Sequence, residues 1–160
     1  MNRPSSDSSS KKSSRREFLQ RSGQITAASA LVGMALPHVH AAEDNTIRLA
    51  LIGCGGRGSG AVANAMNSAY GPVELYAMAD IVEDRITSRH KILAKEFGNR
   101  VNVPKERQFV GFDAYKKAID CLGPNDVAML TNFAYFRPTQ LEYAVEKGVN
   151  VFMEKDFAAD

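Results

Sequence analysis

Residues 47–58 read IRLALIGCGGRG, a short apolar run followed directly by a glycine-rich loop. The first six residues are typical of a strand that is buried on both faces of a parallel sheet. Gly53, Gly55 and Gly58 then occupy the G-x-G-x-x-G positions, and a helical pattern follows them. The order of strand, glycine loop and helix predicts a unit whose helix N-terminus faces an anionic ligand.

Each glycine of this loop has a separate physical reason to be glycine. Gly53 permits the tight turn, Gly55 lets the backbone approach a pyrophosphate, and Gly58 lets the helix lie close to the strand. Gly56 and Arg57 complete the loop that we expect to bind a dinucleotide cofactor. The bare motif also arises by chance in glycine-rich chains, so the prediction depends on its surroundings.

Apolar runs and helical patterns alternate from this loop to the end of the chain. Strands are expected at 47–52, 73–79, 108–110, 126–131 and 149–153, and helices at 56–69, 83–97, 113–121 and 138–147. This alternation predicts an α/β fold, a doubly wound parallel sheet of the Rossmann-like, NAD(P)-binding type over residues 46–160. Ligands of such sheets bind at the carboxyl ends of the strands.

Asp80 ends the second expected strand, 22 residues after Gly58. An acid at this distance is suited to bind the ribose hydroxyls of NAD. Beside the 2′-phosphate of NADP the carboxylate would meet like charge, so the sequence favours NAD over NADP. Arg85 is near enough in sequence to offset that charge, although its simpler interpretation is a solvated helix residue. Asp80 is also a candidate N-cap for the next helix.

The first 41 residues have the features of an export signal. They hold six basic and two acidic side chains, whereas the rest of the chain holds 14 basic and 16 acidic. A Ser-rich start, typical of a disordered segment, precedes Arg15-Arg16, the apolar run 25–36 and the small-residue site 39–41. This order resembles a twin-arginine signal peptide and predicts a periplasmic or other extracytoplasmic protein. The apolar run is too short for a stable membrane span. An uncleaved membrane anchor and an N-terminal helix packed on the domain are the alternatives to a cleaved signal peptide.

The remaining composition argues against two other classes of partner. A slightly acidic domain offers no basic face for nucleic acid. Cys54 and Cys121 lack metal-ligand spacing and are too few for a disulfide framework, so we expect neutral thiols and no metal site.

Together these segments resemble the Gfo/Idh/MocA family, the group of glucose–fructose oxidoreductase and inositol dehydrogenase. The resemblance rests on Leu51–Gly58, Ala79-Asp80, Phe136-Arg137-Pro138 and Val151–Lys155, and it covers residues 46–160. It implies NAD as cofactor, a sugar or polyol as substrate, and a second α/β domain that binds substrate and often mediates oligomerisation. A homo-oligomer is therefore among the expectations.

Glu154-Lys155 matches the start of the family's Glu-Lys-Pro motif, which implies Lys155 as the catalytic lysine and Glu154 as part of the cofactor site. Thr131 begins the stretch where the family's nicotinamide site starts, although the usual Thr-Pro is missing. Asp156 replaces the family's proline, which leaves the direction of Lys155 open. Because the sequence ends at Asp160, we expect a truncated chain or fragment without the substrate domain, in preference to a stand-alone domain or one completed by a partner chain.

Three functions stay open on this basis. The first is an NAD-dependent dehydrogenase that moves hydride to or from a sugar or polyol, with Lys155 assisting the proton. The second is an NAD-dependent glycoside hydrolase of the same superfamily. The third is a non-catalytic nucleotide-binding fragment, which the early end of the sequence favours for this polypeptide.

Overall fold

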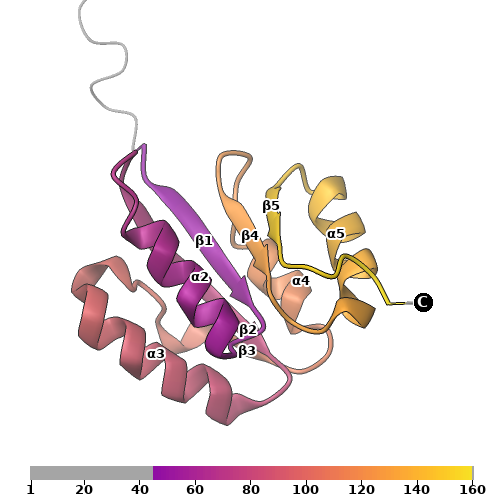
Figure 1. The fold of residues 1–160 in the computed structure, drawn as a ribbon, viewed down its shortest axis with the longest axis horizontal. Coiled ribbons are helices and arrows are strands. Elements are labelled where there is room, and N and C mark those ends of the chain that lie inside the picture. Colours follow the sequence, from indigo (N-terminus) through magenta and orange to yellow (C-terminus); the bar gives the residue numbers. More distant parts are fainter. Residues whose placement is uncertain (1–44, 160) are drawn as a thin grey trace, which may run out of the picture. The chain divides into compact units, whose positions relative to one another are not determined.

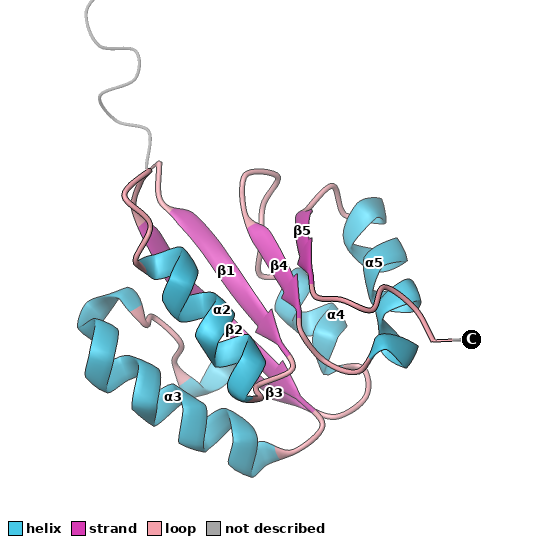
Figure 2. Cartoon of the chain, viewed as in Figure 1, coloured by secondary structure: helices cyan, strands magenta, loops and turns pink. Residues whose placement is uncertain are grey.

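The computed structural model describes residues 45–159, so the expected signal peptide lies outside the described residues. Strands and helices alternate along this range (Figures 1 and 2). The strands are β1 (Ile47–Ile52), β2 (Val73–Asp80), β3 (Gln108–Val110), β4 (Val127–Leu130) and β5 (Asn150–Met153), and the helices are α2 (Gly56–Met66), α3 (Glu83–Phe97), α4 (Ala114–Ile119) and α5 (Arg137–Glu146).

The strands form one parallel sheet with the order β3-β2-β1-β4-β5, which confirms the predicted doubly wound fold. The chain builds outward from β1 to β3 and then crosses back to place β4 and β5 on the other side of β1. Ile52 pairs with Ala79 on one side and with Leu130 on the other. The segments that follow β1, β2 and β4 therefore leave the sheet at the same edge, at the switch point where such folds bind ligands.

Alternate residues of β1 supply two separate hydrophobic cores, one on each face of the sheet. Leu49 and Leu51 belong to the core that includes residues of α2 and α3. Ala50 and Ile52 belong to the core that includes residues of α4 and α5. Burial of apolar surface on both faces explains why β1 reads as an almost continuous apolar run.

Element ends differ from the sequence prediction where tertiary contacts decide them. Helix α2 ends at Met66, its last buried residue, and Tyr70 beyond it is fully exposed. Asp126 precedes β4 as a buried turn residue, because its carboxylate accepts hydrogen bonds from the N–H groups of Arg48 (3.0 Å) and Gly123 (2.7 Å). Within the described range no helix is both long enough and apolar enough to span a membrane.

Candidate functional site

Gly53 makes the turn that leads from β1 into the glycine loop. Its φ of +97° lies in the region that side chains rarely adopt, and a Cβ there would fall 2.6 Å from the backbone nitrogen of Asn132. Its N–H donates to the carbonyl of Ala79 (2.9 Å). The turn thus needs glycine for its backbone angle and for its close contact with the loop after β4.

Gly58 and Gly55 differ in what surrounds them. A Cβ on Gly58 would lie 2.4 Å from the carbonyl oxygen of Gly53 and 2.5 Å from Oγ1 of Thr131, so glycine is required for α2 to pack on β1. A Cβ on Gly55 would meet nothing within 4 Å. No side chain caps the N-terminus of α2, and its first turn holds no acidic residue. This helix end therefore presents N–H groups to an approaching anion.

Asp80 joins the end of β2 to the glycine loop. Its buried carboxylate accepts a hydrogen bond from the N–H of Cys54 (2.7 Å) through Oδ2 and one from Val82 (3.0 Å) through Oδ1. The N-cap of α3 is Val82, so the interpretation of Asp80 as N-cap is wrong. Each carboxylate oxygen can accept more than one hydrogen bond, which leaves capacity for a ligand hydroxyl.

Cys54, whose backbone N–H donates to this carboxylate, has a free, buried thiol. Burial first, and then the negative charge of Asp80, raise the pKa of Cys54 to about 12. The thiol is therefore protonated at neutral pH and offers no thiolate for nucleophilic or metal chemistry.

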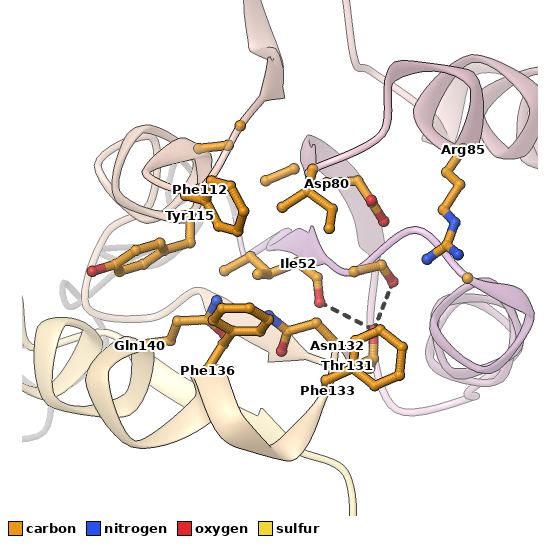
Figure 3. Close-up of a pocket in the computed structure, with 16 residues that line it drawn as sticks. Ile52, Asp80, Arg85, Phe112, Tyr115, Thr131, Asn132, Phe133, Phe136 and Gln140 are labelled. Carbon is orange, nitrogen blue, oxygen red and sulfur yellow. Dashed lines mark hydrogen bonds between the residues drawn. The ribbon is translucent and has the colours of Figure 1, made fainter.

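A pocket of about 750 Å³, open solvent at its mouth included, lies at this edge of the sheet (Figure 3). Its walls come from the segments that follow β1, β2, β3 and β4 and from α5. They include Gly53 and Gly55 of the loop, Asp80, Ile81 and Arg85, Gly111 and Phe112, Thr131 to Phe133, and Phe136 and Gln140. Arg85, which the sequence left as a helix residue, thus lines the same pocket as Asp80.

Thr131 also lines this pocket, and its hydroxyl bonds to the glycine loop. The hydroxyl lies 2.9 Å from the carbonyl oxygen of Gly53 and 3.2 Å from that of Ile52 (Figure 3). The side chain therefore ties the loop after β4 to the end of β1.

Five of the expected site residues lie outside the pocket: Gly56, Arg57, Gly58, Glu154 and Lys155. Arg57 forms an ion pair with Glu154 across the sheet edge. The backbone N–H of Lys155 (3.1 Å) and the side chain of Arg57 both bond Glu154 and lower the pKa of its carboxyl. The Lys155 residue is exposed. Four of the expected residues thus line the pocket, Gly58 packs α2 on β1, and Arg57, Glu154 and Lys155 meet at the end of β5.

Arg137 is a buried cation that the sequence motif contained but did not explain. Its guanidinium donates to the carbonyl of Asn132 (3.0 Å from Nε), to that of Glu154 (2.5 Å) and to that of Asp156. It therefore holds the loop after β4, which carries Thr131, against the segment after β5, which carries Glu154 and Lys155.

Sequence reasoning did not assign several pocket residues to the site, among them Phe112, Asn132, Phe136 and Gln140. These four come from three segments, and no spacing in the sequence marks them. Among residues 45–159, no group of three or more His, Cys, Asp and Glu side chains is arranged to hold a metal ion.

Solved structures of two inositol dehydrogenases resemble this fold. Myo-inositol 2-dehydrogenase from Lactobacillus plantarum is 26% identical with a TM-score of 0.55, and the match covers 72% of this chain and 30% of that one. Scyllo-inositol dehydrogenase from Lactobacillus casei, solved with NAD(H) and scyllo-inositol, is 23% identical with a TM-score of 0.54 and coverages of 72% and 29%. Comparison with family models and with curated proteins found no match.

The chain therefore spans less than a third of the length of these dehydrogenases. Their likeness supports the Gfo/Idh/MocA resemblance in the sequence. Residues 45–159 form a Rossmann-like α/β domain similar to part of an inositol dehydrogenase.

Proposed function

We propose that this chain binds NAD at the carboxyl edge of its sheet, as the nucleotide-binding part of an oxidoreductase. The observation that carries the proposal is the combination of an unobstructed Gly55, an uncapped α2 N-terminus and Asp80 at one edge. The open side of Gly55 and the helix N–H groups suit a pyrophosphate. The spare acceptor capacity of Asp80 suits the ribose hydroxyls.

The carboxylate of Asp80 also underlies the proposed preference for NAD. A 2′-phosphate in the same place would meet its negative charge in a largely buried setting, where Coulomb repulsion is strong. Arg85 also lines the pocket, and its positive charge would attract the 2′-phosphate. The ratio of NAD to NADP affinity therefore reports the balance between Asp80 and Arg85.

The reaction is proposed from the two structurally similar dehydrogenases. Both of these proteins are named as dehydrogenases of an inositol, which is a polyol. Their names support hydride transfer on a sugar or polyol. Bound nicotinamide supplies the hydride chemistry. Lys155, exposed beside Glu154 at the end of β5, is the residue proposed to move the hydroxyl proton once a substrate domain covers it. We further propose export by the twin-arginine route.

Titration of the full chain with NADH and with NADPH, followed by nicotinamide fluorescence, tests cofactor binding directly. The chain has no tryptophan, so protein emission interferes little. We expect saturable binding with NADH clearly tighter than NADPH. Asp80→Asn should narrow the difference, because the substitution removes the charge that repels the 2′-phosphate.

Asp113→Asn is the matched control for this titration. Asp113 is exposed, pairs with Lys116 at 3.6 Å and does not line the pocket, so its removal should leave the NADH/NADPH ratio unchanged. A folded protein that binds neither dinucleotide would overturn the proposal. Equal narrowing in both variants would assign the preference to overall charge and not to Asp80.

A further inference from the structure

Two side-chain oxygens at the pocket lack a hydrogen-bond donor. They are Oδ1 of Asn132, in the loop after β4, and Oε1 of Gln140, on α5. No other side-chain N or O atom in residues 45–159 is buried without a partner. Gln140 as a whole is only 5% exposed. A buried carbonyl without a donor is costly, so a pair of them lining one pocket indicates a ligand that brings N–H groups.

Aromatic rings surround this part of the pocket. The rings of Phe112 and Phe136 have centroids 6.1 Å apart with a tilt of 49° between their planes. Phe112 is 72% exposed, although both residues line the pocket. Figure 3 places Phe136 at the same end of the pocket as Asn132 and Gln140. Exposed aromatic faces of this kind stack on planar bases.

Asp80, Ile81 and Phe112 line the pocket together with the two carboxamides. In the proposed function Asp80 binds the ribose whose 2′-hydroxyl distinguishes NAD from NADP, which is the ribose that carries adenine. The planar group nearest to Asn132 and Gln140 is then adenine, and not the nicotinamide that the resemblance implied for the stretch after Thr131, because Asp80 and the two carboxamides line the same pocket. The nicotinamide extends past the glycine loop toward Glu154. The donor required by the two oxygens is the exocyclic amino group of the base.

We infer that Asn132 and Gln140 form an adenine-reading subsite, in which their side-chain carbonyls accept the two N–H groups of the exocyclic amine. This inference rests on the proposed function, because it takes the position of the ribose from it. The side-chain oxygen of Asn or Gln is a suitable acceptor for an N–H of the exocyclic amine of adenine. Hypoxanthine has a carbonyl oxygen in place of this amine. That oxygen is itself a hydrogen-bond acceptor, so it would donate nothing to the oxygens of Asn132 and Gln140.

Calorimetric titration of the full chain compares two pairs of ligands that differ in this group. AMP is compared with IMP, and NADH with its hypoxanthine analogue, deamino-NADH. We expect the adenine member of each pair to bind about tenfold more tightly, the order of discrimination that a carboxamide gives between bases. Gln140→Met preserves the length of the side chain and removes the acceptor, so both ratios should fall toward one.

Gln108→Met is the matched control. Gln108 lies in β3, donates to the carbonyl of Val103 (3.0 Å) and does not line the pocket, so its loss should leave both ratios intact. Thermal unfolding without ligand provides a second measurement. Because Gln140→Met removes an unpartnered buried carbonyl, this variant should melt at the wild-type temperature or above it.

The outcomes separate this inference from the proposed function. Equal binding of NADH and deamino-NADH overturns the subsite and leaves NAD binding established. If neither dinucleotide binds, the proposed function fails, and the AMP–IMP ratio decides the subsite alone. A Gln140→Met protein that melts lower and keeps its ratios would show that Gln140 is structural, which also overturns the subsite. NADH is also compared with its acetylpyridine analogue, which differs at the nicotinamide. If Gln140→Met changes the ratio of these two affinities and leaves both adenine ratios unchanged, the contact lies at the nicotinamide and the subsite is overturned too.

Discussion

Gly58 shows how one missing side chain positions the proposed phosphate site. A side chain at this position would point at the carbonyl of Gly53 and the hydroxyl of Thr131, which leave no room for a methyl group. Gly58→Ala should therefore push α2 away from β1 and lower the free energy of unfolding by about 1–3 kcal/mol, as overpacking does. Urea unfolding followed by circular dichroism measures the change.

Gly60 is the control for this substitution, because it lies in the same helix and a Cβ added there would meet nothing within 4 Å. Gly60→Ala should be neutral or stabilising by about 0.5–1 kcal/mol, since alanine loses less backbone entropy in a helix. If the two alanines shift the urea midpoint equally, then close packing at Gly58 is not what requires glycine there.

At the residue scale, sequence reasoning found what local spacing encodes. The glycine positions and Asp80 follow from one strand–loop–helix unit, and the structure places Gly53, Gly55 and Asp80 at one pocket. Asn132 and Gln140 were missed because their role depends on burial without a donor. That property is set by packing in the folded chain, and single-residue patterns do not carry it.

At the scale of elements, hydrophobic periodicity predicted the strands and helices because each buries a stripe or face of apolar residues. Its errors lie at element ends. The pattern extends the fourth strand to Asp126, but the carboxylate of this residue instead accepts two backbone N–H groups in a turn. Such ends are decided by hydrogen bonds between segments far apart in sequence, as between Arg48 and Asp126, which periodicity does not report.

Arg137 links elements that the sheet alone does not hold together. Arg137→Lys keeps the charge but loses the planar fork that reaches Asn132, Glu154 and Asp156. Because buried carbonyls lose charge-assisted partners, we expect a loss of about 2–4 kcal/mol in the free energy of unfolding. Urea unfolding tests this, with Arg89→Lys as a control at a partly buried arginine of α3 that does not line the pocket. Similar losses in both variants would contradict a specific role for Arg137.

On the scale of the whole molecule, the sheet order explains why residues from four loops meet at one edge. Strands β2 and β4 flank β1 on opposite sides, so their carboxyl ends carry Asp80 and Thr131 to the glycine loop. The sequence predicted this convergence from the alternation of elements. The sequence does not reveal the substrate, and the match to an inositol dehydrogenase covers only 30% of that chain.

Export is the prediction that concerns the entire chain. A Rossmann-like domain that acquires NAD in the cytoplasm has to cross the membrane folded, and the twin-arginine route transports folded proteins. Arg15→Lys with Arg16→Lys preserves the charge but removes both guanidinium groups, which lysine does not replace in recognition. We expect this double variant to stay in the cytoplasm at full length, whereas the wild type appears outside it, shortened by cleavage after Ala41. Fractionation with immunoblotting measures both location and size.

Lys11→Arg with Lys12→Arg is the matched control and should be exported normally, because these positions only add positive charge ahead of the motif. Export of the twin-lysine chain at the wild-type level would rule out the twin-arginine route and remove the reason for expecting the cofactor to be bound before export.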